Sequence, residues 1–306
     1  MRTLLLNPPS FSDPVRDRRE AEVHWYPVDL CRTAAVLTDS KVVDAPAHQI
    51  SALECIEMAA DFELVVLLTS TSEVSIDLKL AEMMKIVNPK VKVALVGPGV
   101  PVQMERSLEN TAVDLVVHGE YCSAIADFAN GEPHERHQAA WVTKIYQRDL
   151  DIRRYFVPYL LYPYISMGTW RAVDDVAAEI DYALRVLPEV REVFFDDYGL
   201  FEQKSRVLEL CSKLRPLRFT WSCKSTVATD YETLQVMRDS GCRLVVVESP
   251  GDGFTTHCRK LGLAIHGQGL PTKSRMNRLL SFVGGPLRHV TSPGSRTTGH
   301  FTGFGV

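Results

Sequence analysis

Three short segments of the chain have the residue types of a ligand-binding loop, and each follows an apolar run that predicts a strand. Hydroxyl groups in such loops can hydrogen-bond amides or phosphates, and small residues let a large planar ligand lie close to the backbone. If the strands are parallel, their carboxyl ends meet at one edge and the segments form one site. The alternative is that they are ordinary strand-to-helix turns. The segments contain Asn7, Pro8 and Pro9; Thr69, Ser70 and Thr71; and Gly97, Pro98 and Gly99.

Acidic residues follow two apolar runs in the second half of the chain. Asp196 and Asp197 stand at the end of one predicted strand, and Glu248 and Ser249 at the end of another. In a barrel of parallel strands, these ends lie on the face where active sites form. The alternative for each acid is a helix N-cap or a solvated turn.

Seven cysteines occur singly along the chain, which argues against a secreted disulfide framework and favours a cytoplasmic protein. No two of them are separated by only two or three residues, so the spacing predicts no metal site. The simplest interpretation of those in the second half is that they are small, buried hydrophobic residues. The seven are Cys31, Cys55, Cys122, Cys211, Cys223, Cys242 and Cys258.

The composition is that of a globular protein, with 45% hydrophobic and 24% charged residues among 306. A formal net charge of -4 provides no basic field that would attract nucleic acid or an anionic membrane surface. No segment reaches the roughly 18 uninterrupted apolar residues of a membrane span. Small molecules are therefore the expected partners.

Residues 1–132 alternate between short apolar runs and amphipathic stretches, as in a parallel sheet covered by helices. Strands are predicted at 3–6, 41–43, 64–68, 91–96 and 115–118. Helices are predicted at 76–87, 102–108 and 123–130. This order indicates an α/β domain of the doubly wound, flavodoxin-like (Rossmann) type.

A second series of strands and helices occupies residues 163–283, after a predicted linker at 133–162. Its strands are predicted at 164–167, 193–196, 219–223, 244–248 and 263–266, and its helices at 173–186, 204–214, 231–240 and 255–261. Repeated βα units of this length indicate a partial TIM-like barrel. Residues 284–306 are rich in Gly, Ser and Thr and are predicted to be disordered.

An ordered series of short strings, reaching to about Phe282, resembles the cobalamin-binding radical S-adenosylmethionine proteins. Asn7-Pro8-Pro9, the Thr-Ser loop at 69–72 and the string at 113–120 resemble the cobalamin-binding domain of that family. Strings at 163–166, 190–197, 221–223 and 241–249 resemble successive strands of its radical barrel. Strings at 25–27, 148–152 and 257–267 are similar to the hopanoid-biosynthesis branch in particular.

The resemblance implies a cobalamin site that includes Gly119 and Glu120 besides the three loops. It also implies an S-adenosylmethionine pocket near the two acidic strand ends. In the family, a 4Fe-4S cluster cleaves S-adenosylmethionine reductively, and the deoxyadenosyl radical then takes hydrogen from the substrate. The branch implies a lipid-like hopanoid substrate.

Two motifs expected from such a resemblance are missing. The Cys-x3-Cys-x2-Cys triad, whose thiolates would hold the cluster, has no counterpart, and residues 167–171 stand where its loop would begin. The Asp-x-His-x-x-Gly string of corrinoid proteins that replace the lower axial base is also absent. Single histidines such as His48 and His118 are expected to be hydrogen-bonded structural residues rather than metal ligands. We therefore expect no cluster, and cobalamin is the cofactor that remains.

The sequence is interpreted as a truncated or degenerate member of this family without radical activity. Two alternatives stay open. The first is a noncatalytic corrinoid- or nucleotide-binding module whose barrel serves as a scaffold. The second is a damaged reading frame, because the family-like strings fade after residue 282.

Overall fold

The computed structural model describes residues 1–9, 26–70, 73–97, 112–118, 121–131, 141–155, 157, 160, 164–167, 171–196, 203–225, 229–247 and 250–267. All of them belong to one compact unit, Met1–Leu270. The predicted tail at 284–306 and the predicted helix at 102–108 lie outside these residues. The predicted boundaries at 132 and 163 stay predictions.

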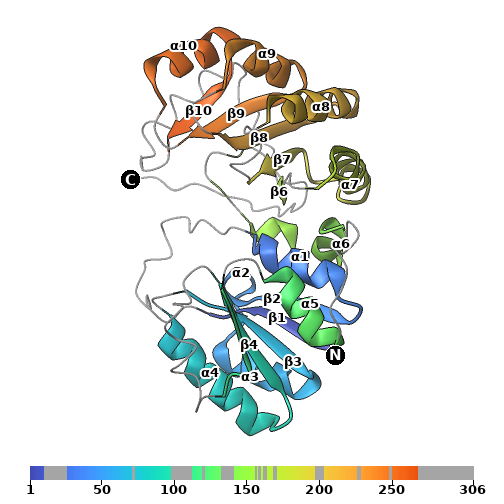
Figure 1. Cartoon of the computed structure of the whole chain (residues 1–306), viewed down its shortest axis with the longest axis vertical. Coiled ribbons are helices and arrows are strands. Elements are labelled where there is room, and N and C mark those ends of the chain that lie inside the picture. Colours follow the sequence, from blue (N-terminus) through green and yellow to red (C-terminus); the bar gives the residue numbers. More distant parts are fainter. Residues whose placement is uncertain are drawn as a thin grey trace, which may run out of the picture. The chain divides into compact units, whose positions relative to one another are not determined.

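The first sheet is parallel throughout, and its strand order is β2-β1-β3-β4-β5 (Figure 1). The chain winds outward from β1 to β2 and then returns to build β3, β4 and β5 on the other side. This reversal confirms the predicted doubly wound domain. The strands are β1 (Thr3–Asn7), β2 (Ser40–Asp44), β3 (Leu64–Leu68), β4 (Lys92–Gly97) and β5 (Leu115–His118).

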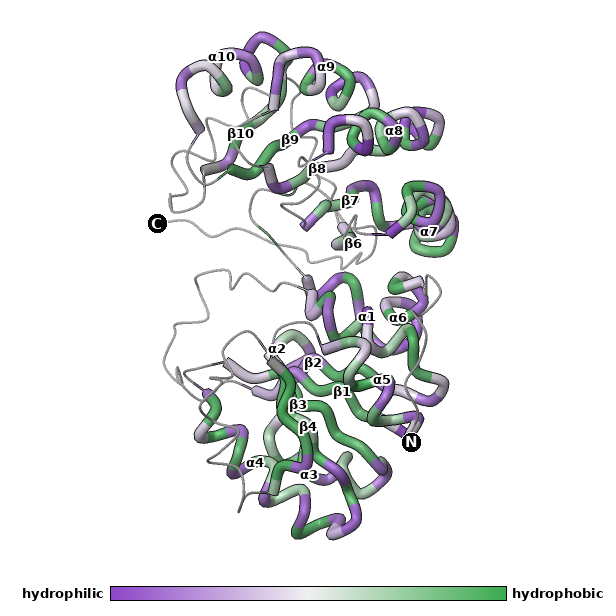
Figure 2. The backbone as a smooth tube through the Cα atoms, in the orientation of Figure 1, coloured by the Kyte–Doolittle hydropathy of each residue, from purple (hydrophilic) through white to green (hydrophobic). Residues whose placement is uncertain are grey.

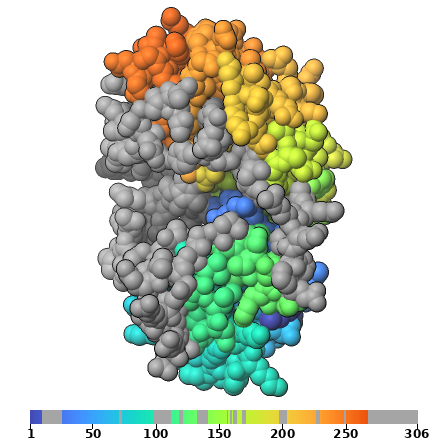
Figure 3. Space-filling view, viewed as in Figure 1, coloured from blue at the N-terminus to red at the C-terminus, as the bar shows by residue number. Residues whose placement is uncertain are grey.

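Helices cover both faces of this sheet. Leu5 of β1 belongs to the core beneath α1 (Val28–Val36) and α5 (Cys122–Asn130). Its neighbours Leu4 and Leu6 belong to the core beneath α3 (Ala52–Met58) and α4 (Val74–Val87). Figure 3 shows the surface of α5 in green. Successive side chains of a strand point to opposite faces, so a strand covered on both sides must be apolar throughout. Figure 2 shows the strands of this sheet as nearly continuous hydrophobic segments.

The second sheet is also parallel, and its strands follow the order β10-β9-β8-β7-β6. The sequential order and the helix after each of the first four strands are those of a partial TIM-like barrel, as predicted. The strands are β6 (Tyr164–Met167), β7 (Glu192–Phe195), β8 (Thr220–Ser225), β9 (Cys242–Val247) and β10 (Ala264–Gly267). The helices are α7 (Val173–Val186), α8 (Lys204–Leu214), α9 (Tyr231–Asp239) and α10 (Asp252–Leu261). Within the described part of the chain, no helix combines the length and apolarity needed to cross a bilayer.

The segment at 133–162 contains ordered elements that its sequence pattern does not predict. A short helix, α6 (Thr143–Arg148), is followed by the 3₁₀ helix Ile152–Arg154. Buried Tyr26 contacts Tyr146 and Tyr155, with ring centroids 4.7 and 4.0 Å apart. Helices of six and three residues are too short to show a hydrophobic period, which explains why they escaped prediction.

A buried ion pair holds three neighbouring strands of the second sheet together. Trp221 pairs with Cys242 and Ser222 with Leu244, so Arg243 is an extra residue between them, as in a β-bulge. Its guanidinium lies 2.7 Å from a carboxylate oxygen of Glu192, which is fully buried and also accepts a hydrogen bond from Ser222. The bulge thus supplies the cation that this carboxylate needs.

Replacing Arg243 with Met should lower the free energy of unfolding by about 3–5 kcal/mol at pH 7, because the buried Glu192 carboxylate would lose its arginine partner. Urea denaturation followed by circular dichroism measures the change. The double variant Arg243→Met/Glu192→Gln should regain most of this loss. A double variant that is no more stable than Arg243→Met would contradict the assignment.

Candidate functional site

The structure brings three of the predicted loop residues to the carboxyl edge of the first sheet. Asn7 ends β1, Thr69 directly follows β3, and Gly97 ends β4. The backbone N–H of Thr69 donates to the carbonyl of Val96 at 2.7 Å, which extends the pairing of β3 and β4 by one residue. Pro8 and Pro9 continue the chain beyond β1. Thr71, Pro98, Gly99, Gly119 and Glu120 lie outside the described residues, and a ligand role for the whole set stays a prediction.

Gly97 is required at this edge by its close approach to Thr69. Its φ is +139°, and a Cβ added to it would lie 2.2 Å from the carbonyl oxygen of Thr69. An L-residue could not adopt this backbone without moving the neighbouring strand. Gly97 therefore leaves the end of β4 without a side chain, and packing against Thr69 is sufficient to explain its presence.

Thr69 is linked to Asp77, a residue that the sequence analysis did not select. The Thr69 hydroxyl donates to Oδ2 of Asp77 at 2.5 Å, and both side chains are buried. Burial raises the pKa of Asp77 to about 6; the Thr69 hydrogen bond lowers it, and the charge of Glu73 raises it further. Asp77 stands in the first turn of α4, where an acid is ordinarily explained by the helix dipole. The sequence thus carried no signal of its burial.

Ser70 begins the turn into α4. Its carbonyl accepts the N–H groups of Glu73 and Val74, both at 3.1 Å, while the residue itself is exposed. Ser70 therefore bonds the start of α4 as a residue of an ordinary strand-to-helix turn does. The distinguishing feature of the loop after β3 is the hydroxyl of Thr69, which is held by a buried acid.

Asn7 is held by a buried carboxylate at the end of β2. Its side-chain amide donates to Oδ1 of Asp44 at 2.8 Å, and the hydroxyl of Tyr155 donates to Oδ2 at 2.9 Å. Burial raises the pKa of Asp44, and the hydrogen bonds from Tyr155 and Asn7 oppose that effect. Asn7 thus joins the ends of β1 and β2, and Tyr155 ties them to the segment after α6.

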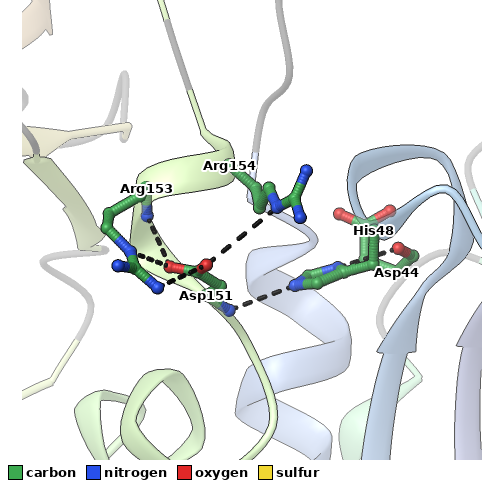
Figure 4. A network of polar contacts seen from close by, with 5 residues as sticks. All are labelled: Asp44, His48, Asp151, Arg153 and Arg154. Atoms are coloured by element: carbon green, nitrogen blue, oxygen red, sulfur yellow. Dashed lines mark hydrogen bonds and ion pairs between the residues drawn. The ribbon is translucent and has the colours of Figure 1, made fainter. Parts of the chain in front are cut away.

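Both ring nitrogens of His48 take part in hydrogen bonds (Figure 4). Nδ1 donates to the carbonyl of Asp44 at 3.0 Å, and Nε2 accepts the backbone N–H of Asp151 at 3.1 Å. The Asp151 carboxylate in turn forms an ion pair with Arg153 at 2.8 Å. The ring is therefore held as the neutral Nδ1–H tautomer, as expected of a structural histidine.

In the second sheet, the structure describes one of the four residues predicted at acidic strand ends. Asp196 directly follows β7, and its carboxylate forms an ion pair with Lys224 of β8. Asp197, Glu248 and Ser249 lie outside the described residues. The pair gives Asp196 a structural partner that the sequence analysis missed, since nothing in the spacing of Lys224 marks it as facing the acid.

Arg171, close after β6, is also engaged within the fold. It is buried and pairs with the fully buried Glu179 of α7. The same carboxylate accepts the N–H and hydroxyl of Thr143 at 2.7 and 2.9 Å. Glu179 therefore holds two places: the first turn of α6 through Thr143, and Arg171, the last residue of the segment 167–171 where the loop of an iron–sulfur cluster would begin.

The cysteines of the second sheet and its helices are buried, as predicted. Burial raises the pKa of Cys211 to about 11 and that of Cys258 to about 12. Burial and the adjacent Cys223 thiol raise that of Cys242. Thiols of this kind remain protonated and unreactive at neutral pH. Among the residues described, no three His, Cys, Asp or Glu side chains are grouped to hold a metal ion.

The Asp77→Asn variant should lose a pH dependence of stability that the wild type has. The folded state binds the Asp77 proton more tightly than the unfolded chain, so this residue's contribution to the free energy of unfolding falls as the pH rises from about 4 to about 6. The difference in free energy of unfolding between the wild type and Asp77→Asn should change by up to about 3 kcal/mol over that pH interval. Urea denaturation at several pH values measures it. Asp39→Asn, at an exposed position, is the control. If the free energies of unfolding of the wild type and Asp77→Asn differ by the same amount at every pH, the assignment is wrong.

The Gly97→Ala variant should lose about 3 kcal/mol or more of stability, because the added methyl group overlaps the Thr69 backbone. Gly262→Ala is the matched control. Gly262 also has a positive φ, +69°, but no atom lies within 4 Å of an added Cβ, so the cost there should be about 1 kcal/mol. Thermal unfolding compares the two. Equal losses would show that backbone conformation, and not the contact with Thr69, decides the choice of glycine.

The sequence matches no protein-family model and no curated protein. The structure is similar to the apo, selenomethionine-labelled structure of the cobalamin-dependent S-adenosylmethionine radical enzyme OxsB, with a TM-score of 0.53 and 10% sequence identity. The match covers 92% of this chain and 47% of the other, so this chain spans about half the length of that enzyme. At this identity, the likeness shows that the two chains share a fold over the matched region.

Proposed function

We propose that this chain is a cobalamin-binding protein of the radical S-adenosylmethionine type whose barrel does not support the radical reaction. The observation that carries the proposal is the carboxyl edge of the first sheet, where the backbone of Thr69 lies against the side-chain-free end of β4 at Gly97. In doubly wound sheets this edge is the usual ligand site. The fold shared with a cobalamin-dependent enzyme and the family-like strings support a corrinoid as the ligand.

The residues at this edge fit a corrinoid in two respects. Gly97 has no side chain, and the Thr69 carbonyl takes the place of its Cβ, so no side chain of this residue stands between the end of β4 and a planar ring. The Thr69 hydroxyl donates its hydrogen bond to Asp77, so its oxygen can only accept further hydrogen bonds, as from the amide groups around a corrin. Because both ring nitrogens of His48 are engaged, we propose binding without this histidine as a cobalt ligand. A bound corrinoid supplies a cobalt ion that can carry a methyl group.

An iron–sulfur cluster does not fit the chain. The triad of closely spaced cysteines is missing from the full sequence. Near the predicted S-adenosylmethionine pocket, Asp196 forms an ion pair with Lys224, and Arg171 forms one with Glu179. We therefore assign no step of a radical reaction to these residues.

A finer proposal follows from the strings at 25–27, 148–152 and 257–267, which resemble the hopanoid branch. It relates the chain to enzymes that modify the side chain of hopanoid lipids, so a lipid-like molecule would be its substrate class. The second candidate function is a noncatalytic corrinoid- or nucleotide-binding module. The ion pairs within the second sheet favour it, since charges that balance each other inside the fold serve a scaffold.

The full chain should bind one equivalent of hydroxocobalamin in an anaerobic titration followed by absorbance and cobalt analysis. Thr69→Val should weaken binding about fivefold to tenfold through the lost oxygen. Thr256→Val, on the exposed side of α10, is the control and should leave binding unchanged. Absence of cobalt in the protein fraction would contradict the proposal that the chain binds a corrinoid.

Reconstitution with iron and sulfide under reducing conditions should leave less than one cluster per chain. No deoxyadenosine should form from S-adenosylmethionine and dithionite, because the thiolates that would hold the cluster are missing. Four irons per chain together with deoxyadenosine formation would contradict the proposal that the barrel does not support the radical reaction. Cobalt binding and iron binding are measured separately, so the two halves can fail independently.

A further inference from the structure

A pocket of about 310 Å³ lies between α1 and α6, away from the carboxyl edge of the first sheet. Leu37 at its rim follows α1 and leads into β2, and Arg148 on the other side reaches the hydroxyl of Ser40, the first residue of β2, at 3.4 Å. The pocket therefore lies at the amino edge of the sheet. Thr69 and Gly97 lie at the opposite edge, so the two sites are separate.

The apolar part of the pocket is formed by buried core side chains. Ala34, Leu37 and Ile145 belong to the main hydrophobic core and are 2%, 8% and 3% exposed. Trp141 forms a wall, and Tyr182 contacts its ring at a centroid distance of 4.9 Å. The hydroxyl of Tyr182 donates to Gln147 at 3.1 Å, which fixes the supporting ring. An indole held in this way presents an apolar surface suited to a flat ligand.

The polar part of the pocket is cationic. Lys144 lies over the Trp141 ring, with its Nζ 5.7 Å from the centroid, and forms no ion pair with any described acid. Arg148 uses Nε and one terminal nitrogen for Asp149, both at 2.8 Å, which leaves its other terminal nitrogen as an available donor. No acid is among the described residues that line the pocket. Asp149 offsets the charge of Arg148, so the uncompensated cation among the described lining residues is Lys144, and it favours an anionic ligand.

We propose that this pocket binds a small aromatic phosphate monoester, with the ring against Trp141 and the phosphate between Lys144 and Arg148. The volume is at the lower end of the range for small-molecule sites, which suits a single ring or nucleoside-sized body. A lysine acts on a phosphate as a point charge, and an arginine donor adds direction. A phosphate monoester has several oxygens, so it can meet the Lys144 ammonium and the remaining Arg148 donor together. The proposal does not depend on cobalamin binding at the other edge.

Isothermal titration of the full chain with phenyl phosphate tests the proposal. Binding of one equivalent is expected, and phenol, benzoate and inorganic phosphate should each bind at least about tenfold more weakly because each lacks the ring or the dianion. Lys144→Gln should weaken the binding of phenyl phosphate about tenfold. Ala35→Phe should fill the pocket and abolish binding. Lys79→Gln, on an exposed position of α4, is the matched control and should leave binding unchanged.

Failure of phenyl phosphate to bind would overturn the proposal, as would unchanged affinity in Lys144→Gln. Inorganic phosphate binding as tightly as phenyl phosphate would overturn the role of Trp141. Benzoate binding as tightly would overturn the selectivity for a phosphate. Lys144 is exposed, so its variant keeps the test valid even if Ala35→Phe disturbs the packing of α1.

Discussion

The contact between Gly97 and Thr69 is the constraint on which the carboxyl edge of the first sheet depends. A Cβ on Gly97 would lie 2.2 Å from the carbonyl oxygen of Thr69. The backbone N–H of Thr69 donates a hydrogen bond to the carbonyl of Val96 at 2.7 Å. The ends of β3 and β4 are thus locked together by backbone alone. Thr69 then anchors the first turn of α4 through Asp77. One small residue and one buried acid therefore fix the described part of this edge at the ends of β3 and β4.

The strands were largely predictable because parallel sheets with both faces covered consist of short, continuous apolar runs. Leu64–Leu68 and Tyr164–Met167 match their predicted ranges, and the long helices Val173–Val186 and Lys204–Leu214 do so as well. The helices α1, α3 and α6 were not predicted, because they are short or weakly periodic. The place of Asn7, Thr69 and Gly97 at one edge followed from the fold class alone.

The residues that the sequence did not reveal are those whose role depends on tertiary burial. Asp77 reads as an ordinary first-turn acid, and only packing shows that its carboxyl is buried against Thr69. Arg243 faces Glu192 because of a one-residue bulge that no pattern marks. Lys224 meets Asp196 across two neighbouring strands. The partners of Arg243 and Lys224 lie far away in the chain, beyond the reach of local periodicity, whereas Thr69 is near Asp77 in sequence but meets it only through the packing of α4.

The central claim is that the carboxyl edge of the first sheet is the ligand site of this fold. Hydrogen–deuterium exchange of the full chain, with and without hydroxocobalamin, tests it most directly. We predict slower exchange after β3 and at the end of β4, around Thr69 and Gly97, with no change in β6 to β10. Pro8 and Pro9 after β1 have no amide hydrogen and do not report. Unchanged exchange around Thr69 and Gly97, or protection confined to the second sheet, would contradict a ligand site at this edge.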